Sequence, residues 1–152
     1  MALFSDQEYR RRIDATHRRM EAAGIDVLVV CDPANMNYLT GYDGWSFYVP
    51  QTVVLSRAEA TPLWIGRGMD VAGARHTTFL PPEAIIGSPD HYVQSPVRHP
   101  MNFVAERIAE RGWGRGTVGV EMDAYYFTAR SYAELQKSLP EARFANADLL
   151  VN

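Results

Sequence analysis

Residues 25–31 read IDVLVVC, and this stretch decides the fold. The run is too short for an ordinary helix, and it is rich in β-branched valine and isoleucine. Its apolar residues are nearly continuous, whereas a strand with one solvated face alternates apolar and polar residues. We therefore predict a strand that is covered on both faces, at the centre of a sheet and parallel to a neighbour.

The sequence before this strand predicts an amphipathic helix. Ser5 is a typical N-cap, and Glu8 stands three residues later, where it can complete a capping box. Phe4 can pack on Tyr9 as a hydrophobic staple, and Gly24 ends the helix. Apolar or small residues at three- and four-residue spacing give the helix one face to lay on a sheet: Tyr9, Ile13, Thr16, Met20 and Ala23.

The sequence after the strand alternates between helices and strands. Asp32 and Pro33 are favourable first residues for a short helix over residues 34–40, which Gly41 ends. A loop over residues 42–50 leads to a predicted hairpin with strands 51–56 and 61–65. Further helices are expected at 69–76, 100–111 and 129–139, the last capped by Thr128, and further strands at 84–86, 117–120 and 143–145. This order predicts an α/β fold with a mixed six-stranded sheet and helices on both faces.

The composition indicates one domain with a substantial core. The chain has 152 residues, of which 47% are hydrophobic and 22% charged. The net charge of −3 makes nucleic acid an unexpected partner, and the arginines of residues 10–12 and 18–19 are interpreted as a solvated helix face. No apolar run approaches the roughly 20 residues of a membrane span, so we expect a cytoplasmic protein without a membrane partner. Cys31 is the only cysteine, and we expect it to be buried and inert.

The sequence offers no constellation of residues that would carry chemistry. Its four histidines fall in unrelated segments, and none has the spacing of a zinc motif. Nucleophile-elbow, P-loop and dinucleotide-binding motifs are absent. Glu121 and Asp123 follow a predicted strand and are interpreted as its solvated end. We therefore predict no catalytic, cofactor-binding or metal-binding residue in this chain.

Residues 42–51, YDGWSFYVPQ, place four aromatic side chains in a nonhelical connection. Aromatic residues in a loop either fill the core of their own domain or form an exposed surface for a partner or ligand. The residues alone leave both interpretations open.

The segment NMNYLTGYDGWSFYVPQTVVL (35–55) resembles the N-terminal domain of the creatinase, prolidase and aminopeptidase P family. The similarity extends to MEAAGIDVLVV, TPLWIG, GTVGVE and the closing YYFTARSYAELQKSLPEARFANADLLVN. It implies a ribonuclease H-like domain over residues 1–147, with residues 148–152 starting a linker to a catalytic domain of the pita-bread fold. The catalytic histidines and any ligands for divalent metal would lie in that absent domain.

Within the family, GRGMD (66–70) and PDHYVQSPVRHP (89–100) look most like ectoine hydrolases, which open the cyclic amidine of ectoine. Creatinases carry a phenylalanine and, two residues later, an arginine that reach the partner subunit's substrate. Phe47 matches the phenylalanine, but Val49 stands in place of the arginine, which argues against creatine as substrate.

The resemblance implies that the domain is non-catalytic and contributes to a homodimer of a C–N hydrolase acting on a small molecule. Trp45, Phe47 and Tyr48 would cap the pocket of the partner subunit in trans. Two alternatives remain open at this point: the N-terminal domain of an Xaa-Pro dipeptidase or aminopeptidase, and a free-standing binding module. The residues that follow position 152 in the gene would discriminate among these three.

Overall fold

The computed structural model describes residues 2–151, and its sheet is built outward from β1 (Val27–Val30). All four residues of β1 are buried. β1 pairs in parallel with β5 (Thr117–Val120) on one side and antiparallel with β2 (Thr52–Ser56) on the other. The prediction of a central strand buried on both faces is confirmed, although only one of its two neighbours runs parallel to it.

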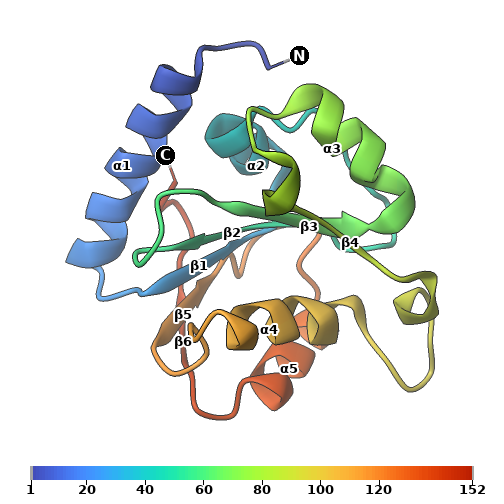
Figure 1. Ribbon diagram of the computed structural model, residues 1–152. Helices are drawn as coiled ribbons and strands as arrows, with labels where there is room; N and C mark the ends of the chain where they lie inside the picture. Colours follow the sequence, from blue (N-terminus) through green and yellow to red (C-terminus); the bar gives the residue numbers. More distant parts are fainter. Residues whose placement is uncertain (1, 152) are drawn as a thin grey trace.

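The sheet is mixed and six-stranded, as predicted, with the order β4-β3-β2-β1-β5-β6 (Figure 1). The outer strands are β3 (Leu63–Arg67), β4 (Ile85–Ser88) and β6 (Arg143–Asn146). β2 is antiparallel to both of its neighbours, and the remaining pairs are parallel. Five strands therefore run in one direction, and their carboxyl ends lie at one edge of the sheet, the carboxyl edge.

Helices cover both faces of the sheet, which confirms the predicted layers (Figure 1). Those on one face are α1 (Asp6–Ala22), α2 (Pro33–Thr40) and α3 (Val71–Thr77). Those on the other face are α4 (Pro100–Glu110) and α5 (Ala129–Ser138). Short 3-10 helices lie at Gly68–Asp70, Pro82–Ala84 and Asp90–Tyr92. No helix in the described part of the chain has the length and apolarity that crossing a membrane requires.

The capping of α1 is confirmed in part. The Ser5 hydroxyl accepts a hydrogen bond from Glu8 N, and the rings of Phe4 and Tyr9 meet edge to face at 6.0 Å. The Glu8 carboxylate does not complete a capping box, because it binds the guanidinium groups of Arg11 and Arg12 instead. These contacts lower the pKa of Glu8 to about 2. Ala23 was expected on the buried stripe but is exposed, since the helix ends at Ala22.

The other predicted helix ends agree closely with the structure. The Asp32 carboxylate caps α2, and Gly41 ends it with a φ of +83°, a conformation that favours glycine. Thr128 caps α5, as expected. In α4 the buried face includes Phe103, whereas Ala109 is exposed.

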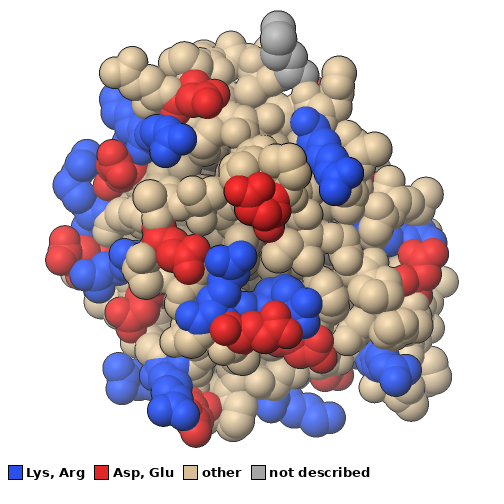
Figure 2. Space-filling model, viewed as in Figure 1, with Lys and Arg blue, Asp and Glu red and all other residues tan. Residues whose placement is uncertain are grey.

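Charged side chains of both signs are interspersed on the face shown in Figure 2, with no large area of one sign. The arginines of α1 are exposed, with the exception of Arg12. The guanidinium of Arg12 is largely buried, stacks over the rings of Phe4 and Tyr38, and donates to the backbone oxygen of Tyr38. Arg12 therefore belongs to the packing of α1 on α2, and the prediction of a solvated helix face is wrong for this residue.

The segment after β6 turns back to α1. Arg19 donates to the backbone oxygen of Val151 at 2.8 Å, and the Val151 side chain is buried. The predicted linker begins within this segment, and its last residue, 152, lies outside the described residues. The boundary between domain and linker stays a prediction.

Candidate functional site

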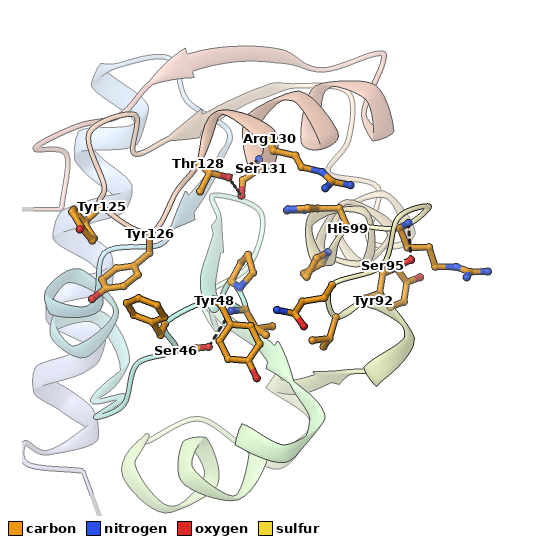
Figure 3. Close-up of a pocket in the computed structure, with 17 residues that line it drawn as sticks. Ser46, Tyr48, Tyr92, Ser95, His99, Tyr125, Tyr126, Thr128, Arg130 and Ser131 are labelled. Atoms are coloured by element: carbon orange, nitrogen blue, oxygen red, sulfur yellow. Dashed lines mark hydrogen bonds between the residues drawn. The ribbon is translucent and has the colours of Figure 1, made fainter.

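Three segments that are far apart in the sequence line one pocket of about 370 Å³ at the carboxyl edge (Figure 3). They are residues 46–50 before β2, residues 92–100 between β4 and α4, and residues 125–131 from the end of β5 into α5. In open α/β sheets, ligands bind outside the carboxyl ends of the strands. The position of the pocket therefore makes it the candidate site.

The aromatic loop (residues 42–51) divides its side chains between the core and the surface. Tyr42 is buried and packs on the Trp64 ring at 5.1 Å. The three predicted site residues between the loop's ends are exposed: Trp45 by 61%, Phe47 by 78% and Tyr48 by 58%. These three side chains thus form an exposed surface, whereas Tyr42 fills the core of its own domain.

Polar contacts join the second half of the aromatic loop to the neighbouring segments. Arg67 donates to the Tyr48 hydroxyl at 3.4 Å and to the Asp90 carboxylate at 2.8 Å, and the hydrogen bond to Asp90 raises the pKa of Arg67. Gln51 donates to Asp70 at 2.8 Å where the loop enters β2. These contacts anchor the aromatic loop to the sheet at Tyr48 and Gln51.

The structure adds two aromatic residues that sequence reasoning missed. Tyr126 meets the Trp45 ring at 6.2 Å and the Tyr125 ring at 5.4 Å, and Trp45 meets Phe47 at 6.3 Å. Phe47, Tyr48, Tyr125 and Tyr126 line the pocket, whereas Trp45 lies outside it and supports Phe47 and Tyr126. The signal in the sequence was a run of three adjacent aromatic residues, 125–127, that begins five residues after the end of a strand.

The opposite wall of the pocket contains His99, one of the four histidines for which no role was predicted (Figure 3). Its Nδ1 accepts from Met101 N at 3.1 Å, and its backbone N–H donates to the Asn102 side chain at 2.7 Å, so His99 forms a capping box for α4. Burial lowers the pKa of His99. The imidazole is therefore neutral at pH 7, and its proton is on Nε2 because Nδ1 is the acceptor.

The first turn of α5 supplies the remaining polar wall. Thr128 and Ser131 both line the pocket, and their hydroxyls lie 3.1 Å apart. Between them in the sequence, Arg130 also lines the pocket. Its nearest carboxylate is that of Glu134, at 3.9 Å, which is the outer limit of an ion pair. Glu134 also accepts the Asn102 amide at 3.0 Å.

The prediction that Glu121 is a solvated strand end is wrong. Its side chain is only 4% exposed, and one carboxylate oxygen accepts from the backbone N–H groups of Cys31 and Asp32, each at 2.8 Å. The other oxygen accepts the Asn35 amide at 2.6 Å. Backbone N–H groups between β1 and α2 need an acceptor once they are buried, and Glu121 provides it from the end of β5. Asp123, by contrast, is exposed as predicted.

Nucleophile and metal chemistry find little support in the described residues. The Cys31 thiol is buried, and burial raises its pKa to about 12, so it is protonated at neutral pH. Within residues 2–151, histidine, cysteine and carboxylate side chains do not gather in a group of three or more that could hold a metal ion. The pocket is suited to bind and cover a small molecule, with aromatic rings on one wall and cationic and hydroxyl groups on the other.

Comparison with known proteins places this arrangement in a family. Residues 12–152 match the family described as the Creatinase/Prolidase N-terminal domain. The chain belongs to this family. Ectoine hydrolase from Halomonas elongata is 52% identical over 150 residues, which are 98% of this chain and 37% of that protein. An uncharacterised hydrolase/peptidase from Sinorhizobium fredii, y4tM, is also 52% identical, over 98% of this chain and 38% of its own length. The creatinase-type domain thus spans little more than a third of these two relatives.

Solved structures confirm the fold of the domain. A proline dipeptidase from Streptococcus agalactiae superposes with a TM-score of 0.72 at 16% identity, covering 93% of this chain and 96% of that one. An Xaa-Pro dipeptidase from Bacillus anthracis gives a TM-score of 0.71 at 19% identity, covering 94% of this chain and 34% of that chain. At identities this low, the similarity shows that the chain has the α/β fold of creatinase/prolidase N-terminal domains, and it says nothing about the substrate.

Proposed function

We propose that this chain is the non-catalytic N-terminal domain of an ectoine hydrolase-like C–N hydrolase, and that its aromatic loop forms part of the substrate pocket of the partner subunit in a homodimer. The catalytic residues, and divalent metal where one is used, belong to the catalytic domain that would follow. The observation that carries this proposal is the exposed aromatic loop, with Trp45, Phe47 and Tyr48 held in place at the surface.

The choice of substrate class rests on sequence identity. The relative named ectoine hydrolase is 52% identical to this chain over 150 residues, which are 98% of this chain and 37% of that protein. The Xaa-Pro peptidases share 16–22% and are similar in fold. Ectoine is a cyclic amidine, and aromatic faces attract such a cation while excluding water from it.

The geometry supports a role for the loop outside its own domain. Phe47 is 78% exposed, so its ring adds little to this domain's core. A cluster of exposed aromatic residues marks a surface that another molecule covers. The hydrogen bond from Arg67 restrains Tyr48, which reduces the conformational entropy that this side chain would lose on covering a substrate.

Kinetics of the full-length enzyme test this proposal. Phe47→Ala should raise KM or lower kcat for ectoine, whereas the stability of the domain should change by no more than about 0.5 kcal/mol, because the side chain is exposed. Leu3→Ala is a matched control, since Leu3 is 76% exposed and precedes α1. Strong loss of stability with unchanged kinetics per folded molecule would make Phe47 a structural residue.

Mixed dimers test the action in trans. Subunits that carry Phe47→Ala are mixed with subunits inactivated in the catalytic domain. If the loop serves the partner, each mixed dimer contains one complete site, and random pairing restores about a quarter of the wild-type turnover. If the loop serves its own subunit, the mixed dimers gain nothing over the parent variants. Turnover of Xaa-Pro dipeptides and not of ectoine would reject the substrate class.

A further inference from the structure

The charged side chains that line the pocket at the carboxyl edge are all positive. The 17 lining residues include two arginines, Arg98 and Arg130, and no aspartate or glutamate, and His99 adds a neutral imidazole. Three carboxylates near the pocket have partners in this chain: Asp90 binds Arg67, Glu106 lies 3.3 Å from the Tyr92 hydroxyl, and Glu134 accepts from the Asn102 amide and lies 3.9 Å from Arg130. A cavity with cations on its wall and no resident anion favours a ligand that brings its own negative charge.

His99 and Arg130 form the polar side of the pocket. Figure 3 shows both on the wall opposite Ser46 and Tyr48. Capping of α4 uses the Nδ1 atom of His99, so Nε2–H is its only ring donor for a ligand. Arg130 is the second residue of α5, where a cation is unfavourable because the helix dipole is positive at that end. The i,i+4 contact with Glu134, at 3.9 Å, offsets this only weakly, whereas an anionic ligand beside Arg130 would pair with it directly.

The pattern of donors favours a carboxylate over a phosphate. Phosphate sites at helix N-termini use several free backbone N–H groups. At α4 none of the first three positions offers one: Pro100 has no N–H, and those of Met101 and Asn102 are bonded to His99. At α5 the N–H of Ser131 is bonded to the Thr128 hydroxyl, and the charged and ring donors on this wall are the planar fork of Arg130 and the imidazole N–H of His99, which match the two oxygens of a carboxylate.

We infer that this pocket binds a small organic acid, with its carboxylate held by Arg130 and His99 and its ring or chain against Phe47, Tyr48 and Tyr126. Arg98 adds a second positive charge, because its side chain forms no ion pair among the described residues. A volume of about 370 Å³ suits a ligand of this size. The inference deepens the proposed function and rests on it for one point, the identity of the acid, since ectoine carries a carboxylate beside its amidine.

A pair of probes with one shape and different charge tests the inference on the 152-residue chain. Benzoate and benzamide are titrated separately and followed by backbone NMR shifts. We expect benzoate to shift amides of residues 94–99 and 128–131, and benzamide to bind at least about tenfold more weakly, because only the carboxylate pairs with a guanidinium. Equal binding of both probes, or binding of neither, would overturn the inference.

Matched variants locate the carboxylate. Arg130→Gln should weaken benzoate about tenfold without affecting benzamide. Arg115→Gln is the control, since Arg115 is an exposed arginine at the opposite edge of the sheet, paired with Glu141. His99→Asn keeps an N-cap residue at α4 and should also weaken benzoate. If Arg115→Gln weakens benzoate binding as much as Arg130→Gln does, the assignment is refuted. If inorganic phosphate binds more tightly than benzoate, the pocket is a general oxyanion site and not a carboxylate site.

The two proposals can fail separately. If Arg130-dependent benzoate binding is found but the full-length enzyme does not turn over ectoine, the pocket assignment stands and the substrate of the proposed function is wrong. If ectoine is turned over and Arg130→Gln changes neither its KM nor benzoate binding, the pocket assignment is wrong and the proposed function stands.

Discussion

Replacing Glu121 by alanine removes the acceptor that joins the end of β5 to the start of α2. Three donors lose their partner: the backbone N–H groups of Cys31 and Asp32, and the Asn35 amide. The carboxylate is 4% exposed, so water does not readily replace it. The change acts on the segment that leads through α2 to the aromatic loop.

The expected loss follows from the two backbone groups. A buried donor without an acceptor costs about 1 to 3 kcal/mol. Relief of the buried charge offsets part of this, so we expect Glu121→Ala to lower the free energy of unfolding by about 3 kcal/mol. For a domain of this length, the midpoint of thermal unfolding should fall by roughly 6 to 12 °C.

Glu121→Gln separates the hydrogen bonds from the charge. One amide oxygen can still accept from Cys31 N and Asp32 N, so the loss should be about 1 kcal/mol. Burial raises the pKa of Glu121 above its ordinary value of 4.5, although the hydrogen bonds from Asp32, Asn35 and Cys31 oppose this. A carboxyl group with a raised pKa stabilises the fold fully below its unfolded pKa and loses that contribution as the pH rises. The stability difference between wild type and Glu121→Gln should therefore narrow as the pH rises above 4.5.

Urea and thermal unfolding followed by circular dichroism measure these differences, with Asp123→Ala as the exposed control. Asp123 lies two residues later, and its replacement should change stability by no more than about 0.5 kcal/mol. The account of Glu121 is refuted if the alanine variant is as stable as the Asp123 control. If the stability difference between wild type and Glu121→Gln widens as the pH rises, the raised pKa of Glu121 is refuted.

Three further outcomes are expected. Val29→Asp should prevent stable folding, because an unpaired carboxylate in β1 costs several kcal/mol against a total of about 5 to 15 kcal/mol, and a soluble variant with a normal melt would contradict this. The Cys31 thiol, with a pKa of about 12, should not react with a disulfide reagent at pH 8 until the chain unfolds, so rapid labelling of the native chain would show that the site opens. The purified 152-residue chain should hydrolyse none of ectoine, creatine and Xaa-Pro dipeptides, with or without divalent metal, and turnover of any of them would show that it has a catalytic site of its own.

Local sequence signals predicted the elements of this fold well. Asp32 and Gly41 define the two ends of α2 through side-chain and backbone chemistry that lies within a few residues. The continuous apolar run around Val29 likewise identified the central strand. Such signals work because capping and strand burial depend on neighbouring residues.

The candidate site was predicted only in part, because it depends on which loops the strand order brings together. Phe47 and Tyr48 could be recognised as unusual within their own loop. His99 and Tyr126 could not, since nothing near them in the sequence indicates that they face the same pocket. Glu121 was misread for the same reason, because the donors that bury it lie about ninety residues earlier.

The common direction of five strands gives the molecule two ends that differ as sites for engineering. The hairpin turn between β2 and β3 lies at the edge of the sheet away from the pocket. A fluorophore or tag inserted at residues 57–60 would sit on a rigid support and leave the pocket wall unchanged. The same insertion in residues 88–100 would rebuild that wall. An immobilised or labelled form for binding measurements should therefore be attached through the hairpin.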